Sequence, residues 1–388
     1  MQPIYLDHAA TTPVRPEVLE AMLPFLSVAW GNPSSSHRFG RAARAGLEQG
    51  KRDVAAALGA EPNQVIFTSG GTEADNLALI GAALAARSHG RRMHVVTTAI
   101  EHKAVLAAAH AVVTLGGEET ILGVDRQGVI RFDELDEALE RQPALVSVMW
   151  VNNEVGVVQP MPEIGARCEA AGVPLHSDAV QAFGKLPIDI AASGCRLLSI
   201  SGHKIGAPKG IGALIVRDRR IVDAIIHGGG QQYGIRPGTE NVAGAVAMGR
   251  AAQLARQELD GERARLAALR EDLRARLAAA VCDLVVHGEG PHAPHILSIS
   301  VPGAEAEALL MHLDLAGIAC SGGSACATGA VEPSHVLTAM GVERSLALGT
   351  LRFSLGHDTT AADIECLVGA FPGVVARVRQ LSSTLGRA

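Results

Sequence analysis

Residues 197–217 read LLSISGHKIGAPKGIGALIVR. An apolar run at 197–201 leads into a polar cluster that contains Lys204, and a second apolar run follows a glycine-rich turn. Short apolar runs between such turns are typical of buried strands. Similar runs stand at 64–69, 93–98, 145–151 and 173–177, with helix-like segments such as 72–87 between them. This alternation predicts an α/β fold with a mainly parallel sheet between helices.

The length of 388 residues favours about two domains. An Ala-, Leu- and Arg-rich helix is expected from roughly 243 to 281, and shorter strands such as 295–301 follow it. We therefore predict a large domain at 15–255, and a smaller α+β domain formed by 1–14 together with 256–388.

The composition favours a globular protein that does not bind nucleic acid. Hydrophobic residues make up 48% of the chain and charged residues 19%, and the net charge is −6. Phosphate backbones attract concentrated Lys and Arg, which this chain lacks. The N-terminus has no basic and apolar leader, and no apolar run reaches the ~18 residues of a membrane span. We therefore expect a cytoplasmic protein, in which six cysteines do not form a disulfide framework.

Polar clusters follow several of the predicted strands. They are TSGGTEADN (68–76), EHK (101–103), NNE (152–154), SDAVQ (177–181) and SGHK (201–204). In open α/β sheets, ligands bind at the carboxyl ends of the strands. One such cluster would carry little weight, but a set of them predicts a single binding crevice.

Each cluster also has an ordinary structural interpretation. Lys204 is a surface lysine, a phosphate-binding lysine or a Schiff-base lysine, and the Walker order of residues is absent. The glycines before Thr72 form either an anion site at a helix N-terminus or a plain strand-to-helix turn. Asp178 pairs with a pyridine nitrogen or caps a helix, and His102 stacks on a ring or is structural. Taken together, a phosphate site, a carboxylate and a lysine match the requirements of pyridoxal 5′-phosphate.

The chain resembles cysteine desulfurases of the NifS/IscS type, within the class V aminotransferases. The resemblance covers nearly the whole chain. Its motifs are YLDHAATTP, GNPSSSHRFG, FTSGGTEADNLAL, EHKAV, VNNEVGVVQP, SDAVQAFGKLPID, SGHKIGAPKGIGAL, RPGTEN, SGGSACATG and LRFSLG. It implies the fold type I of pyridoxal-phosphate-dependent transferases, with the catalytic cysteine loop in the smaller domain.

The resemblance also implies a role for each matching position. The cofactor contacts would be Gly71, Thr72, His102, Asn153, Asp178, Gln181, Ser201, His203, Lys204 and Thr239. Lys204 would carry the cofactor, and His102 would stack over its ring. Thr239 would reach the phosphate from the other subunit, which implies a homodimer. Asn153 and Arg352 would hold the substrate carboxylate, a role that suits the planar fork of an arginine.

The implied reaction converts L-cysteine to L-alanine and leaves a persulfide on Cys326, with Cys326, Lys204 and His102 as catalytic residues. The sulfur would pass to an acceptor or scaffold protein, for iron–sulfur cluster assembly or tRNA thiolation. No resident metal is expected, only a transient iron–sulfur contact at Cys326. The alternatives are a selenocysteine lyase, another class V enzyme, or a catalytically silent binding module. A cysteine on a Gly- and Ser-rich loop argues against an aminotransferase.

The chain departs from the family pattern in a few places. The loop CSGGSAC (320–326) has an added cysteine, Cys320, and a glycine at 322 where serine is usual. The segment before Thr239 lacks a Glu-Arg pair, and the sequence ends at Ala388, before the tail with which many members dock a scaffold. Because Cys320 ends an apolar run, we expect a small buried residue there. The resemblance implies that the nucleophile is Cys326, which holds the matching position.

Overall fold

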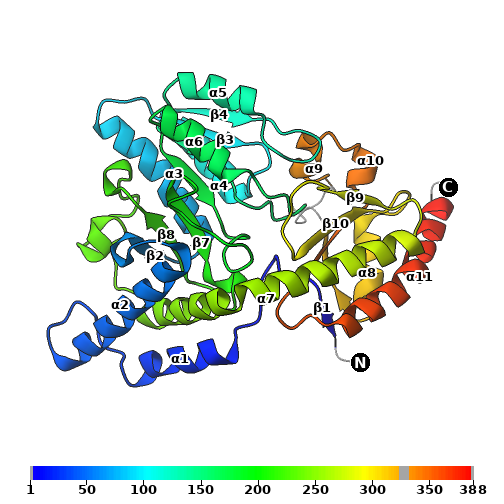
Figure 1. Cartoon of the computed structure of the whole chain (residues 1–388), viewed down its shortest axis with the longest axis horizontal. Coiled ribbons are helices and arrows are strands. Elements are labelled where there is room, and N and C mark those ends of the chain that lie inside the picture. Colours follow the sequence, from blue (N-terminus) through cyan, green and yellow to red (C-terminus); the bar gives the residue numbers. More distant parts are fainter. Residues whose placement is uncertain (1–2, 323–331, 386–388) are drawn as a thin grey trace.

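A seven-stranded sheet forms the centre of the larger part of the molecule (Figure 1). The computed structural model describes residues 3–322 and 332–385. The strands lie in the order β2 (Val65–Thr68), β8 (Gly212–Val216), β7 (Cys195–Ser201), β6 (Leu175–Asp178), β5 (Leu145–Ser147), β3 (His94–Thr98) and β4 (Glu118–Leu122). Strand β8 is antiparallel to both of its neighbours, β2 and β7, and the other neighbouring pairs of strands in this sheet are parallel. The predicted α/β fold with a mainly parallel sheet is confirmed.

Both faces of this sheet are buried because its strands are apolar on both sides. Ile66 and Val95 belong to the core beneath α3 (Gly71–Ser88) and α4 (Lys103–Thr114). Phe67 and Val96, one residue further along the same strands, belong to the core on the opposite face. The helices of that face are α2 (Arg38–Leu58), α5 (Phe132–Glu140), α6 (Met161–Ala170) and the first part of α7 (Val242–Ala280). Strands buried on both faces read as continuous apolar runs, which is why they stood out in the sequence.

A four-stranded antiparallel sheet forms the second part of the molecule. Its order is β12 (Ser321–Gly322), β13 (Thr350–Ser354), β10 (Ile296–Ser300) and β9 (Val285–His287). It shares a core with α8 (Ala306–Leu315), α11 (Ala361–Leu385) and the second part of α7. The N-terminal strand β1 (Ile4–Tyr5) pairs with β11 (Ile318–Ala319), and Leu6 enters the same core.

Helix α7 connects the two parts, as Figure 1 shows. It has 39 residues and is therefore roughly 60 Å long. Its residues up to Leu254 pack in the core of the large sheet, and those from Leu266 pack in the core of the small one. The expected helix at 243–281 matches it closely. The helix runs through residue 255 without a break, and the domain division at that point stays a prediction.

The remaining helices are short or peripheral: α1 (Pro16–Ser27), α9 (His335–Ala339) and α10 (Arg344–Ala347). Two strands of the large sheet differ from expectation. The apolar run at 145–151 forms a strand only to Ser147, and the chain turns further on, where the Gly156 amide donates to the Asn152 carbonyl oxygen at 3.0 Å. Strand β4 was not expected, since it is an edge strand with the half-exposed sequence EETIL and only Leu122 fully buried.

Candidate active site

A cavity of about 450 Å³ opens at the carboxyl ends of the strands of the large sheet. It gathers nearly all the residues that the sequence singled out. Those that line it are Gly71, Thr72, His102, Asn153, Asp178, Gln181, Ser201, His203, Lys204 and Arg352. The polar clusters behind separate strands therefore form one site, as the topology of a parallel sheet requires.

Lys204 lies in the turn directly after β7 and lines the cavity. Its Nζ donates hydrogen bonds to the carbonyl oxygens of Ala9 at 2.5 Å and Ala10 at 2.6 Å. Burial, followed by the positive charge of Arg352, lowers the pKa of Lys204 to about 8. An amine with this pKa exists in part as the free base near neutral pH, which a nucleophilic lysine needs.

Asp178 ends β6 and is buried. Its Oδ1 accepts a hydrogen bond from the Val180 amide at 2.9 Å, which leaves Oδ2 for a further partner. Burial raises the pKa of Asp178, while the nearby His102 and Lys204 act in the opposite direction. A cation placed against Oδ2, such as a protonated ring nitrogen, would hold this carboxylate in its charged form.

His102 caps the N-terminus of α4 at the rim of the cavity. Its Nδ1 accepts a hydrogen bond from the Ala104 amide at 3.1 Å, so a neutral ring carries its proton on Nε2. Desolvation and the Lys204 cation lower the pKa of His102, against the opposing effect of Asp178. The ring is therefore neutral in most molecules near pH 7.

The part of the cavity wall formed by the start of α3 suits an anion. Helix α3 begins at Gly71, so its first amides face the cavity without partners of the helix itself. A Cβ atom at Gly71 would lie only 2.9 Å from Cγ2 of Val180, and the glycine keeps this approach open. Ser201 and His203 lie beside it, where β7 ends.

These residues fit pyridoxal 5′-phosphate. The start of α3 would hold its phosphate, Asp178 its ring nitrogen, and Lys204 its aldehyde carbon. The donor and acceptor types match the three polar ends of the cofactor, and the cavity volume lies within the range of cofactor sites. Gln181 lines the same cavity, and its Nε2 donates a hydrogen bond to the Ala9 carbonyl oxygen at 2.9 Å.

Arg352 lies on β13, so the small sheet contributes to the same cavity. Its Nη1 donates to the Asn153 carbonyl oxygen at 2.7 Å, and its Nη2 donates to Oδ1 of Asp7 at 2.8 Å. The side chain is buried, and its Nε–H has no hydrogen-bond partner within the described residues. A planar guanidinium in the wall of a cavity suits a carboxylate.

Several polar residues of the site were missed by the sequence reasoning. Asp75, Glu154 and His335 also line the cavity, and Glu101 lies buried behind it. Asp75 and Thr72 are three residues apart on one helix, a spacing that puts both on one face and could have signalled Asp75. Glu154 accepts a hydrogen bond from the Ser334 hydroxyl, a contact between distant segments that no local pattern reveals.

Two of the described positions singled out in the sequence, Thr239 and Cys320, do not line this cavity, and a third cannot be placed. Thr239 is exposed and does not line it. Cys326 lies outside the described residues, so its role as nucleophile stays a prediction. Cys320 is described; it packs against the core of the small sheet, and burial raises the pKa of its thiol to about 12. A thiol with such a pKa stays protonated at neutral pH. Cys320 is half-buried, where a buried residue was expected.

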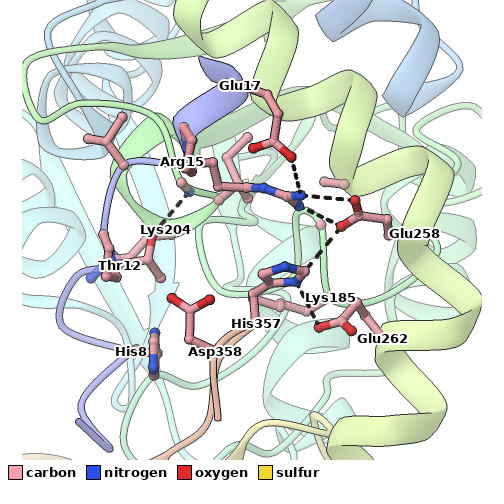
Figure 2. Close-up of a pocket in the computed structure, with 17 residues that line it drawn as sticks. His8, Thr12, Arg15, Glu17, Lys185, Lys204, Glu258, Glu262, His357 and Asp358 are labelled. Atoms are coloured by element: carbon pink, nitrogen blue, oxygen red, sulfur yellow. Dashed lines mark hydrogen bonds and ion pairs between the residues drawn. The ribbon is translucent and has the colours of Figure 1, made fainter. Parts of the chain in front are cut away.

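A larger cavity of about 540 Å³ adjoins the first and shares Lys204 with it (Figure 2). Its polar side chains are largely paired with each other. Nη2 of Arg15 donates to Oε1 of Glu258 at 3.0 Å, and Nδ1 of His357 lies 3.5 Å from Oε2 of Glu262. Of the predicted site residues, only Lys204 lines it. The smaller cavity is therefore the candidate active site.

The comparisons with known proteins agree with this geometry. Residues 4–367 match the family model of class-V aminotransferases. The chain belongs to the class-V aminotransferase family. An IscS-like cysteine desulfurase of Mycobacterium tuberculosis is 45% identical over 97% of this chain and 97% of its own length.

Solved structures show the same relationship. A NifS-like protein superimposes with a TM-score of 0.88 at 32% identity, covering 97% of this chain and 100% of its own. SspA, solved in complex with cysteine, gives a TM-score of 0.79 at 32% identity, covering 91% and 98%. The predicted family, fold type and enzyme class, a cysteine desulfurase dependent on pyridoxal 5′-phosphate, are thus confirmed. None of the helices in the described ranges is both long and apolar enough to cross a membrane.

Proposed function

We propose that this cysteine desulfurase acts on L-cysteine through Arg352, Lys204, His102 and Cys326, and that it releases L-alanine while Cys326 receives the sulfur. The arrangement of Lys204, Asp178 and Arg352 around one cavity carries the proposal. The relative SspA, solved with cysteine, supports the choice of substrate.

Arg352 and Asn153 would orient the substrate. The Asn153 backbone oxygen already holds Nη1 of Arg352, so the two residues form one unit on the wall of the cavity. The guanidinium has five N–H donors, of which the Asn153 oxygen and Asp7 engage two, and a remaining one would donate to the substrate α-carboxylate. This contact would direct the substrate amine and Cα toward Lys204, which lines the same cavity.

Lys204 would first hold the cofactor and then move a proton at the substrate Cα. The bound cofactor supplies an electron-withdrawing ring that weakens the bonds at Cα. A lysine with a pKa of about 8 both accepts and returns a proton near neutral pH. Asp178 would keep the ring nitrogen protonated, and His102 would cover the ring.

Cys326 would supply the thiolate, a role that rests on the sequence motif. Its sulfur would attack the substrate sulfur as the bond from that sulfur to Cβ breaks. Cβ would take up a proton to give L-alanine, and Cys326 would keep the extra sulfur as a persulfide. The atoms balance, since one cysteine and one thiol give one alanine and one persulfide.

The partners and the compartment complete the proposal. A homodimer would bring Thr239 of the partner subunit to the phosphate, in accord with the exposed position of Thr239 outside its own cavity. A sulfur acceptor or iron–sulfur scaffold protein would remove the persulfide sulfur. We place the reaction in the cytoplasm, on the sequence features described above.

The test is turnover of L-cysteine by the cofactor-loaded protein under reductant, with alanine and sulfide measured together. We expect equal amounts of the two products. Arg352→Ala should lower kcat/KM at least about thirtyfold, since losing a buried charge-assisted contact typically costs about 2–5 kcal/mol. Arg126→Ala, a change at an exposed arginine, is the matched control. Alanine formed without sulfide, or an unaffected Arg352→Ala variant, would contradict the proposal.

A further inference from the structure

The segment that contains Asp7 is fixed against strand β13. Asp7 and Ser354 form a parallel bridge, and the Ser354 amide donates to the Leu6 carbonyl oxygen at 2.8 Å. The Ala9 amide donates to the Ser354 hydroxyl at 2.9 Å. Because Arg352 stands two residues before Ser354 on this strand, the Asp7 backbone has a defined position beside it.

The Asp7 carboxylate is one of two fixed acceptors for the Arg352 guanidinium. Nη2 meets Oδ1 of Asp7 at 2.8 Å, and Nη1 meets the Asn153 backbone oxygen at 2.7 Å. The Arg352 and Asp7 side chains are only 8% and 21% exposed, so water competes weakly for this contact. A long, flexible side chain held at both terminal nitrogens has its plane fixed, and its Nε–H is left without a partner in the described part of the chain.

Asp7 also balances charge in the site. A buried guanidinium without a counter-ion is strongly unfavourable. The charged groups that act on the Lys204 amine are Arg352, Asp7 and Asp178. Arg352 lowers the pKa of Lys204 and the two carboxylates oppose it. Asp7 therefore affects both the residue proposed to bind the substrate and the residue proposed to bind the cofactor.

We propose that Asp7 is a positioning residue of the active site, which holds the Arg352 guanidinium in the plane that receives the substrate carboxylate. This inference rests on the proposed role of Arg352. Asp7 is not proposed to touch the substrate; it acts on substrate binding through Arg352, and on Lys204 through its charge. The loss of Asp7 should weaken substrate binding far more than it slows the steps that follow.

The first test compares Asp7→Ala and Asp7→Asn with Asp358→Ala in the cofactor-loaded enzyme. Asp358 is an exposed aspartate with no hydrogen bond or ion pair among the described residues, so it controls for the loss of a carboxylate. We expect Asp7→Ala to raise KM for L-cysteine at least tenfold, with kcat changed less than threefold. Asp7→Asn should be intermediate, because its amide oxygen still accepts from Nη2. Asp358→Ala should resemble the unaltered enzyme.

A second readout does not depend on turnover. The visible absorption of the bound cofactor, titrated with pH, reports the protonation of the nitrogen that Lys204 supplies. The Arg352 cation lowers the pKa of this nitrogen, and the Asp7 carboxylate opposes that effect. The pH at the midpoint of the titration should therefore fall in Asp7→Asn, and it should stay unchanged in Asp358→Ala. If Asp7→Ala does not fold, Asp7→Asn carries both tests.

The double variant separates positioning from general damage. In an Arg352→Ala background, Asp7→Ala should change kcat/KM less than twofold, because Asp7 then has nothing to position. If Arg352→Ala raises KM but Asp7→Ala leaves it unchanged or lowers it, the inference about Asp7 is overturned and the proposed function stands. If Arg352→Ala itself has no effect, the proposed function fails first. A full effect of Asp7→Ala in the Arg352→Ala background also overturns the inference.

Discussion

The amine of Lys204 donates a hydrogen bond to the carbonyl oxygen of Ala9 at 2.5 Å, although the two residues are 195 positions apart in the chain. The N-terminal segment thus closes one side of the active site with backbone oxygens. Thr12 extends this contact, because its hydroxyl donates to the His203 carbonyl oxygen at 2.8 Å. The turn that presents Lys204 is therefore held against the N-terminal segment, which gives a nucleophilic lysine a fixed place.

This geometry predicts that Lys204 alone carries the cofactor. Borohydride reduction of the cofactor-loaded protein, followed by peptide mapping, should place the pyridoxyl group on Lys204. Lys185 is the internal control, because it lines the adjoining cavity and burial lowers the pKa of its amine too. A label on Lys185, Lys103 or Lys209 would refute the assignment.

The sequence was sufficient to predict the strands that are apolar on both faces, and the residues at their carboxyl ends. Phe67 and Ile66 illustrate why, since each contacts a different core and the run they form has no polar interruption. Strand β4 was missed because an edge strand buries little and its residues alternate weakly. Lys204 and Asp178 could be predicted because each follows such a strand directly.

Contacts between distant segments could not be predicted in this way. The Asp7–Arg352 pair joins the two ends of the chain, and nothing in either local pattern specifies its partner. The contacts of Glu101 could not be predicted either. This residue precedes His102 in the sequence, yet its side chain is buried. Its Oε1 accepts from the Thr98 hydroxyl and the Met149 amide, each at 2.8 Å.

Glu101 should make the protein less stable as the pH rises. Burial raises the pKa of its carboxyl from 4.5 in the unfolded chain to about 8 in the native state. Between these values the native state keeps a proton that the unfolded state releases, so the free energy of unfolding should fall with rising pH. For this group alone the slope is on the order of 1 kcal/mol per pH unit.

The change Glu101→Gln removes this titration. Denaturant unfolding at pH 5 and pH 8 should show the variant gaining stability relative to the unaltered protein as the pH rises. Asp358→Asn, at an exposed site, serves as the control and should follow the unaltered protein at both values. A constant difference between Glu101→Gln and the unaltered protein would show that Glu101 is ionised in the native state.

Gly212→Ala should destabilise the anion end of the site. A Cβ atom at Gly212 would lie 2.6 Å from the Gly70 carbonyl carbon and 2.8 Å from the Ile200 carbonyl oxygen, and backbone atoms cannot rotate away. Overpacking of this kind typically costs about 1–3 kcal/mol. Gly70 precedes α3, so affinity for the cofactor should fall as well. Thermal unfolding and a cofactor-binding titration measure the two effects.

The matched control is Gly369→Ala. Gly369 lies on α11, and nothing stands within 4 Å of its added Cβ. Alanine should stabilise this exposed helical position by about 0.5–1 kcal/mol and leave cofactor binding unchanged. Equal effects of the two substitutions would mean that the close approach at Gly212 does not constrain the fold.

The choice between the two cysteines of the segment 320–326 yields the last prediction. Cys320 is half-buried and packs against the core of the small sheet, where desolvation and then the nearby Asp7 carboxylate raise the pKa of its thiol to about 12. A protonated thiol is a poor nucleophile, so Cys320→Ala should keep most of the sulfide release. Cys326→Ala should abolish it, yet L-cysteine should still alter the visible spectrum of the bound cofactor. Mass spectrometry after one turnover without reductant should find the extra sulfur on Cys326. An inactive Cys320→Ala variant with a native spectrum and normal unfolding, or sulfur found on Cys320, would reverse the assignment.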